Sequence, residues 1–321
     1  MVDSCLTQKH SSVAGSLTFV LKAFSLLSVP LILAGCSDLA LFDANGPVGQ
    51  SIADSMTYTT LLMLVIIIPT IFLSVFIPYH YRSGNKKARY EPEWYHSTVI
   101  EIIIWGIPIL IIGILGVEAY KSTHALDPRK PIITEEYGEE DALKIQVVAL
   151  NWKWLFIYPE EGIATINEIG IPVDRPVEFL LTSDGGINSF FVPRLGSQLY
   201  AMNGMECRLY LMADEPGVMD GMSANYSGFG FSGMRFKVHA TDEGTYNQWI
   251  NKVKNEGTLL DDAAYDELKQ KSRDNPVEYF VNADPLRFKN IIDSNANSYG
   301  LQPIQQDGPT EEDMIKESAG L

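Results

Sequence analysis

The sequence predicts a membrane protein in three parts: a transmembrane hairpin of two helices, an all-β sandwich, and a C-terminal helical extension. Two apolar runs, at about 57–79 and 98–118, are each long enough to cross a bilayer. Short segments rich in β-branched and aromatic residues follow, with Gly, Pro, Asn and Asp between them. Residues 244–271 then have the amphipathic pattern of helices, interrupted at Gly257.

The composition excludes some classes of function. The chain of 321 residues has a formal net charge of −16, whereas a protein that binds nucleic acid needs a basic surface for the phosphates. Its three cysteines, Cys5, Cys36 and Cys207, form no Cys-x-x-Cys pair and no cluster with histidine. The sequence therefore indicates neither a zinc site nor a disulfide framework.

The N-terminus has the features of a bacterial lipoprotein signal. Residues 23–35 form a short apolar stretch after Lys22, well below the roughly 20 residues of a membrane span. The stretch ends in Leu-Ala-Gly-Cys, the lipobox pattern in which the cysteine is acylated and becomes the mature N-terminus. We therefore expect residues 1–35 to be a signal peptide, and Cys36 to anchor the segment 36–56 to the membrane lipid.

The charges around the two apolar runs predict their orientation. The linker between the runs carries four cationic residues, Arg82, Lys86, Lys87 and Arg89. The segment 37–56 contains no lysine or arginine. Because positive charge is retained in the cytoplasm, the linker is expected there and both outer ends in the periplasm. The chain is thus predicted to lie in the bacterial inner membrane with two spans, at about 57–79 and 98–118, and everything after about residue 120 outside the cytoplasm.

An acidic residue near the cytoplasmic end of the second span is a functional candidate. Ionisable groups within membrane spans are costly, so Glu101 in VIEIIIW is read either as a functional group or as a carboxylate that reaches the interface one turn in. Glu118, at the other end of the same span, is expected to be an interfacial residue.

The soluble part is expected to be a sandwich followed by helices. The predicted strands are KIQVVAL, WKWLFIY, VEFLLT, NSFFV, ECRLYLM, GMSANYS and MRFKVHA. Such short strands at close spacing are typical of a β-sandwich or barrel. We expect the sandwich domain at 121–241, the helical extension at 242–297, and a flexible acidic tail at 298–321.

One stretch, SANYSGFGFSGM at 223–234, has the spacing of a copper-binding loop but not its ligands. A hairpin joined to a β-sandwich resembles subunit II of the haem-copper terminal oxidases, whose cytochrome c oxidases hold a binuclear copper centre in a cupredoxin domain. Their ligands follow the pattern His, then Cys-x3-Cys-x3-His-x2-Met. With Met234 as the anchor, the family's other site positions, including the acidic residue between the cysteines, are occupied here by Asn188, Ser223, Asn225, Ser227 and Phe231.

These replacements indicate the branch of the family. Copper in such a site needs thiolate and imidazole ligands, which serine, asparagine and phenylalanine cannot supply. The chain therefore resembles subunit II of the quinol oxidases, most closely the cytochrome bo-type ubiquinol oxidases. Three further stretches, 122–128, 151–169 and 188–205, share this resemblance. Residues Trp152 and Trp154 are interpreted as packing, because no copper relay remains for them to serve.

The resemblance also implies cofactors and partners. Ubiquinol would deliver electrons directly to subunit I, which would hold haem b, haem o (or a) and copper, without cytochrome c. This chain would bind no metal and contain no catalytic residue. It would assemble with subunits I, III and IV, and Glu101 would lie at the mouth of a proton pathway into subunit I. The loop at 223–234 would still close the sandwich and pack on its partner.

Two other functions remain open on this reasoning. The first is subunit II of a menaquinol oxidase with the same architecture. The second is a lipid-anchored cupredoxin-like binding module without an oxidase partner. The paired spans argue against the second, because a lipid anchor alone would suffice for attachment.

Overall fold

The computed structural model describes residues 39–89 and 91–299, and the backbone of 304–305. Internal contacts divide the chain into Met1–Asp43 and Ala44–Leu321, and all the elements named below belong to the second unit. The predicted signal peptide and Cys36 lie outside the described residues, as does the tail from 306 onward.

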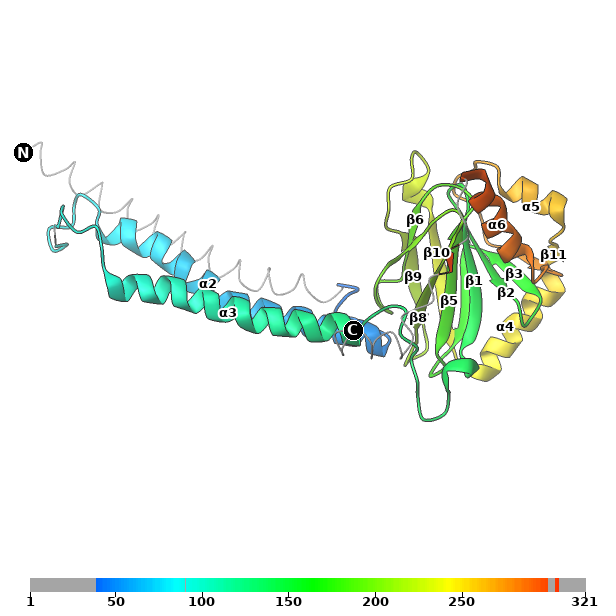
Figure 1. Ribbon diagram of the computed structural model, residues 1–321, viewed down its shortest axis with the longest axis horizontal. Helices are drawn as coiled ribbons and strands as arrows, with labels where there is room; N and C mark the ends of the chain where they lie inside the picture. Colours follow the sequence, from blue (N-terminus) through cyan, green and yellow to red (C-terminus); the bar gives the residue numbers. More distant parts are fainter. Residues whose placement is uncertain (1–38, 90, 300–303, 306–321) are drawn as a thin grey trace, which may run out of the picture. The chain divides into compact units, whose positions relative to one another are not determined.

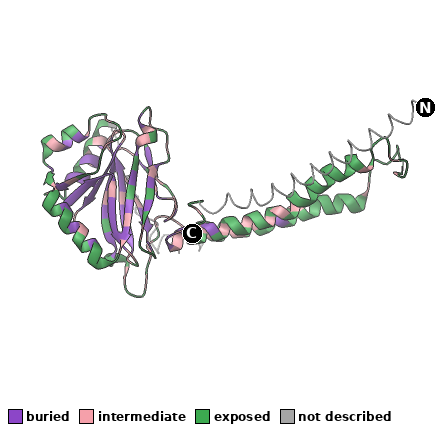
Figure 2. Cartoon of the chain, turned by 180° about the vertical axis from the view of Figure 1, so that it is seen from behind, coloured by how far each residue is buried: buried purple, intermediate pink, exposed green. Residues whose placement is uncertain are grey.

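The two predicted membrane helices are present. Helix α2 spans Pro47–His80 and helix α3 spans Thr98–Ala125, and both are long and apolar enough to cross a membrane. They contact one another, yet most of their residues are exposed (Figure 2). Helix α2 begins ahead of the predicted span because Pro47, at its first turn, starts the helix within the polar residues that precede the apolar run.

The larger sheet of the sandwich has eight strands in the order β11-β12-β3-β2-β1-β5-β8-β13 (Figure 1). Four of its seven strand pairs are antiparallel, and the other three, β1 with β5, β11 with β12 and β8 with β13, are parallel. Its strands are β1 Leu143–Ala149, β2 Trp154–Tyr158, β3 Ile163–Ile166, β5 Val177–Ser183, β8 Met205–Leu211, β11 Thr258–Leu259, β12 Glu278–Val281 and β13 Ile304–Gln305. The last of these lies within the segment that was predicted to be a flexible tail.

The smaller sheet has five strands in the order β4-β10-β9-β6-β7. These strands are β4 Glu168–Pro172, β6 Asn188–Phe191, β7 Leu199–Ala201, β9 Gly217–Ser223 and β10 Arg235–Thr241. Two 3-10 turns, η1 Glu139–Asp141 and η2 Phe231–Gly233, complete this part of the chain. Strand β9 ends at Ser223, earlier than predicted, so residues 224–234 connect β9 to β10, and the residues 224–233 of this connection are called the loop below.

Aromatic side chains fill the core between the two sheets. Trp154 and Phe190 are fully buried and meet edge to face, with ring centroids 5.6 Å apart. Phe190 in turn stacks on Phe236 at 5.1 Å. The predicted packing role of Trp154 therefore agrees with its position at the centre of the sandwich.

Part of the helical extension covers the outer face of the larger sheet. Its helices are α4 Glu243–Glu256, α5 Asp262–Leu268 and α6 Arg287–Tyr299. Side chains of α5 and α6, including Tyr265 and Ile291, pack on outward residues of β1, β2 and β3. Every residue of β2 is buried as a result, which explains why its sequence shows no alternation of polar and apolar residues. The extension also contributes strands β11 and β12, although it was predicted as helices alone.

Candidate functional site

The loop of residues 224–233 has a well-defined frame. At its neck the Ser223 N–H donates to the Met234 carbonyl at 3.1 Å, and the Ala224 N–H donates to the Ser189 carbonyl of β6 at 3.0 Å. Further along, the Phe231 N–H donates to the carbonyl of Gly228, a residue at φ +104°. The neck of the loop is therefore closed by a backbone hydrogen bond, and the loop is bonded to β6.

Two of the positions aligned with the family's metal site, Asn188 and Ser223, are joined by a hydrogen bond, and a third, Asn225, bonds to the residue before Asn188. The Ser223 hydroxyl donates to Asn188 Oδ1 at 2.9 Å, and both residues are buried. The amide groups are also satisfied, because Asn188 Nδ2 donates to the Gly186 carbonyl and Asn225 Nδ2 donates to the Ile187 carbonyl. The polar side chains at these positions thus bond within the chain.

The other positions are apolar or lack a partner. Met234 is 1% exposed and belongs to the sandwich core, while Phe231 meets Tyr226 edge to face at 5.6 Å. The buried Ser227 hydroxyl has no hydrogen-bond partner among the described residues. A single unpartnered hydroxyl is a poor ligand for a soft metal ion.

The residues at the loop do not fit copper. Hydroxyl, amide and phenyl groups replace the thiolates and imidazoles that a copper centre requires, and a buried methionine alone is a weak ligand. Across residues 39–89 and 91–299, His, Cys, Asp and Glu nowhere gather in a group of three or more that could hold a metal.

Trp152 is the loop contact that reasoning from sequence missed. Its indole N–H donates to the Ser227 carbonyl at 2.9 Å, and its backbone is in the left-handed region at φ +66°. A Cβ added at Gly230 would lie 2.4 Å from the indole ring, so that glycine is required for the close approach. Trp154 packs in the core, whereas Trp152 holds the loop. In the sequence, the glycines at 228 and 230 are the signal that could have indicated this close contact with Trp152.

The structure places Glu101 in the first turn of α3 beside a histidine. Glu101 Oε1 lies 2.6 Å from His96 Nδ1, and both side chains are about half exposed. The Thr98 hydroxyl lies 3.2 Å from the other ring nitrogen of His96. A carboxylate at a helix N-terminus is stabilised by the helix dipole, and a carboxylate–imidazole pair can pass a proton between its members.

A second carboxylate, Glu168, is unsuited to proton transfer. It accepts hydrogen bonds from Trp249 Nε1 and Tyr279 Oη, both at 2.8 Å, and His239 Nε2 lies 3.6 Å from its other oxygen. Burial alone would raise the pKa of Glu168, but the hydrogen bonds from His239, Trp249 and Tyr279 lower it to about 2. The group stays ionised near neutral pH and joins β4 to α4, β10 and β12.

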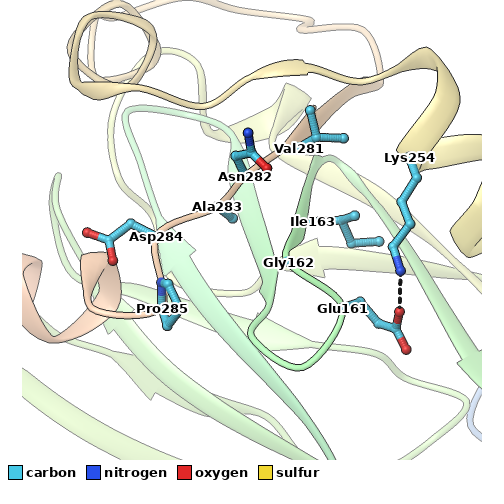
Figure 3. A pocket seen from close by; sticks show the side chains of 9 residues that line it. All are labelled: Glu161, Gly162, Ile163, Lys254, Val281, Asn282, Ala283, Asp284 and Pro285. Atoms are coloured by element: carbon cyan, nitrogen blue, oxygen red, sulfur yellow. Dashed lines mark hydrogen bonds and ion pairs between the residues drawn. The ribbon is translucent and has the colours of Figure 1, made fainter.

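A hollow between the β2–β3 turn and residues 281–285 is a further candidate (Figure 3). At its rim Lys254 Nζ and Glu161 Oε2 form an ion pair at 2.7 Å (Figure 3). The Asp284 carboxylate accepts the Leu286 N–H at 2.9 Å. Because these charged groups already bond within the chain, the hollow offers no convergent set of groups to a ligand.

Comparison with known proteins gives consistent matches. Residues 136–241 match the family model described as cytochrome c oxidase subunit II, periplasmic domain, and residues 254–298 match the COX aromatic rich motif. The chain is 48% identical over 266 residues to ubiquinol oxidase subunit 2 of Acetobacter aceti, covering 83% of this chain and 85% of the relative. It is 47% identical over 266 residues to cytochrome bo(3) ubiquinol oxidase subunit 2 of Pseudomonas aeruginosa, covering 83% and 79%.

One solved structure was also compared with the sandwich. The periplasmic domain of subunit II of cytochrome oxidase from Bradyrhizobium japonicum aligns with 35% of this chain and 94% of its own length. The two are 19% identical, with a TM-score of 0.34.

Proposed function

The chain belongs to the subunit 2 family of the ubiquinol oxidases, within the haem-copper oxidases, and we propose that it serves there as a non-catalytic subunit. Its sandwich is the cupredoxin-like domain of that family, and its partner complex is an oxidoreductase. Within this family the chain's own contribution is assembly, stability and a proton entrance. The carrying observation is the loop of residues 224–233, which keeps its frame while its residues cannot hold copper.

Electron transfer is proposed to bypass this chain. Without a metal at the loop, electrons from ubiquinol would enter the haem-bearing subunit I directly, and cytochrome c would not serve as donor. Haem b, haem o (or a) and copper are proposed to lie in subunit I, with subunits III and IV completing the complex. The exposed apolar surfaces of α2 and α3 support the part of this proposal that concerns partner subunits, because they require lipid or partner helices around them.

The membrane topology proposed for the chain places both of its ends in the periplasm. The cationic linker between α2 and α3 favours the cytoplasm, and the two helices then return the sandwich to the other side. Cys36 is proposed to carry a lipid after removal of residues 1–35. Mass spectrometry of the mature N-terminal peptide tests this directly: acylated Cys36 as first residue supports the proposal, and an intact precursor overturns it.

Glu101 is proposed to deliver protons toward subunit I. The support is its place in the first turn of α3 and its contact with His96, which adds a second group able to carry a proton. The imidazole was not anticipated from the sequence. Its ring lies five residues before Glu101, ahead of the helix, where periodicity gives no signal.

Oxygen consumption of the purified complex tests the proposed function. The full chain, tagged and purified with its partners from detergent-solubilised membranes, is supplied with reduced ubiquinol, reduced menaquinol or reduced cytochrome c. Rapid oxidation of ubiquinol with none of cytochrome c is the expected result. Preference for menaquinol would move the chain to the other quinol branch. Oxidation of cytochrome c would refute the electron route, and the absence of a haem-bearing partner would favour the binding module.

A further inference from the structure

The segment of residues 269–275, here called the strap, joins α5 to β12 within the aromatic-rich region. Both of its ends are fixed to the sandwich by side-chain amides. Asn151 Nδ2 donates to the Lys269 carbonyl at 2.8 Å, and Asn167 Nδ2 donates to the Asn275 carbonyl at 3.0 Å. Asn151 precedes β2, and Asn167 lies between β3 and β4. The strap therefore crosses the sandwich as a tethered segment.

Two cationic side chains of the strap contact aromatic rings. One ring is in the loop, and the other is that of Trp152, which is bonded to the loop. The Arg273 guanidinium lies 4.5 Å from the centre of the Phe229 ring, and the Lys271 ammonium lies 5.9 Å from the Trp152 ring. Trp152 in turn holds the Ser227 carbonyl. Cation–aromatic contacts at exposed positions are individually weak, so their effect here depends on several acting together.

Close steric fits accompany these contacts. A Cβ at Gly233 would lie 2.6 Å from Asp274 Oδ1. Trp152 and Asp274 are both in the left-handed region, at φ +66° and +51°. Non-glycine residues hold such backbone conformations only where the surroundings fix them. The strap, Trp152 and the loop thus determine one another's conformation.

We propose that the strap and Trp152 fix the loop of residues 224–233 in place of the metal ion that its sequence can no longer hold. A metal would tie successive loop positions to the body of the domain. Here Trp152 holds Ser227, Arg273 holds Phe229, and Asp274 fits against Gly233, which together span the loop. The inference assigns the C-terminal extension a role beyond covering the sheet, and it rests on contacts within this chain alone.

Hydrogen exchange in the purified full complex tests the proposal, with mass spectrometry following the amides of 224–233. The variant Lys271→Ala/Arg273→Ala should exchange at these amides about tenfold faster than the wild type, while β1 and β2 are unaffected. Trp152→Phe, which keeps a ring but loses the N–H donor, should have the same local effect. Lys289→Ala, which removes an exposed cation from α6, is the matched control and should change nothing.

Several outcomes would overturn the proposal. Unchanged loop exchange in the double variant would show that the strap does not hold the loop. Faster exchange in Trp152→Phe alone would assign the role to that residue without the strap. If the double variant fails to fold, the single variants Arg273→Lys and Arg273→Met are compared instead. The proposal requires the loop amides to exchange more slowly in Arg273→Lys, which keeps a cation, than in Arg273→Met. Equal exchange rates in the two variants would refute it. Since exchange reports on the loop itself, the result stands whichever donor the complex oxidises.

Discussion

Two glutamates of this chain have different surroundings and therefore different uses. Glu101 is half exposed and has one imidazole beside it, with its Oε1 2.6 Å from His96 Nδ1. Glu168 is mostly buried and receives hydrogen bonds that stabilise only its ionised form. A proton carrier must exist in both forms, whereas a structural joint is strongest when one form is fixed. Their surroundings therefore agree with a proposed functional role for Glu101 and a stabilising role for Glu168.

Replacing Glu101 should slow the complex without unfolding it. In Glu101→Gln the side chain keeps its size and loses its exchangeable proton, so quinol oxidation should fall about tenfold. Oxygen consumption, together with proton uptake by vesicles containing the oxidase, measures the effect. Glu118→Gln, at the other end of α3, is the matched control and should retain wild-type rates. Unchanged turnover and proton uptake in Glu101→Gln would refute the proton entrance.

Acid should weaken the joint at Glu168. Folding lowers the pKa of this carboxyl from 4.5 to about 2. Its contribution to the free energy of unfolding is therefore fully present above the unfolded-state pKa and is lost as the pH falls toward 2. The contribution amounts to about 3 kcal/mol at neutral pH. Glu168→Gln should therefore unfold at a lower temperature at pH 7, with a smaller difference from the wild type at pH 3.

Tryptophan fluorescence of the full chain in detergent follows this transition. Glu256→Gln, an exposed carboxyl at the end of α4, serves as the control and should leave the melting temperature unchanged at both pH values. An equal loss of stability at pH 7 and pH 3 in Glu168→Gln would show that the ionised carboxylate is not the source of the effect.

Among the helices and strands, the sequence predicted those that are determined by local patterns. The membrane helices follow from hydropathy, and α4 and α5 follow from amphipathic spacing, with Asp242 and Asp261 accepting backbone N–H groups at their starts. Strands β3, β4 and β7 were missed because they are short and carry little alternation. Strand β12 was missed because its pairing with β3 joins residues more than a hundred positions apart, which periodicity cannot reveal.

The same limit applies to the candidate site. The aligned positions around Met234 were readable because a spacing pattern marks them. The roles of Trp152 and of the strap were not, because they depend on contacts between the turn before β2, the loop, and the segment after α5. The tryptophan pair Trp152 and Trp154 looks alike in sequence, and only the backbone at φ +66° turns the first toward the loop.

Helix α4 should depend on a glycine in the strand beneath it. A Cβ at Gly170 would lie 2.6 Å from the ring of Trp249, whose indole also donates to Glu168. A rigid ring cannot yield as a flexible chain end does, so Gly170→Ala should displace α4 and cost roughly 1–3 kcal/mol of stability. Gly186→Ala is the control, because a Cβ added at Gly186 would have no atom within 4 Å apart from its chain neighbours. Denaturant unfolding of the full chain in detergent measures both variants, and equal midpoints would contradict this account.

At the scale of the whole molecule, the chain combines surfaces of two kinds. The sandwich is covered by its own extension and satisfies most of its buried polar groups internally. The hairpin helices instead expose large apolar side chains along their described length, as Ile68, Phe72, Ile102 and Ile109 illustrate. Water is an unfavourable environment for such surfaces. The described helices therefore need lipid or partner helices around them.

Restoring ligands should make the strap dispensable. The variant Asn188→His/Ser223→Cys/Ser227→Cys/Phe231→His places imidazoles and thiolates on the existing frame, where Asn188 and Ser223 are already in contact. Asn225 can remain because it is anchored to the Ile187 carbonyl. With added Cu²⁺, this variant should gain the visible absorption of copper–thiolate bonds. Once the metal ties the loop, removing Lys271 and Arg273 should no longer speed its hydrogen exchange. A coloured variant whose loop still needs the strap would show that the two are not equivalent, and a colourless one would show that the frame has lost the geometry of the metal site.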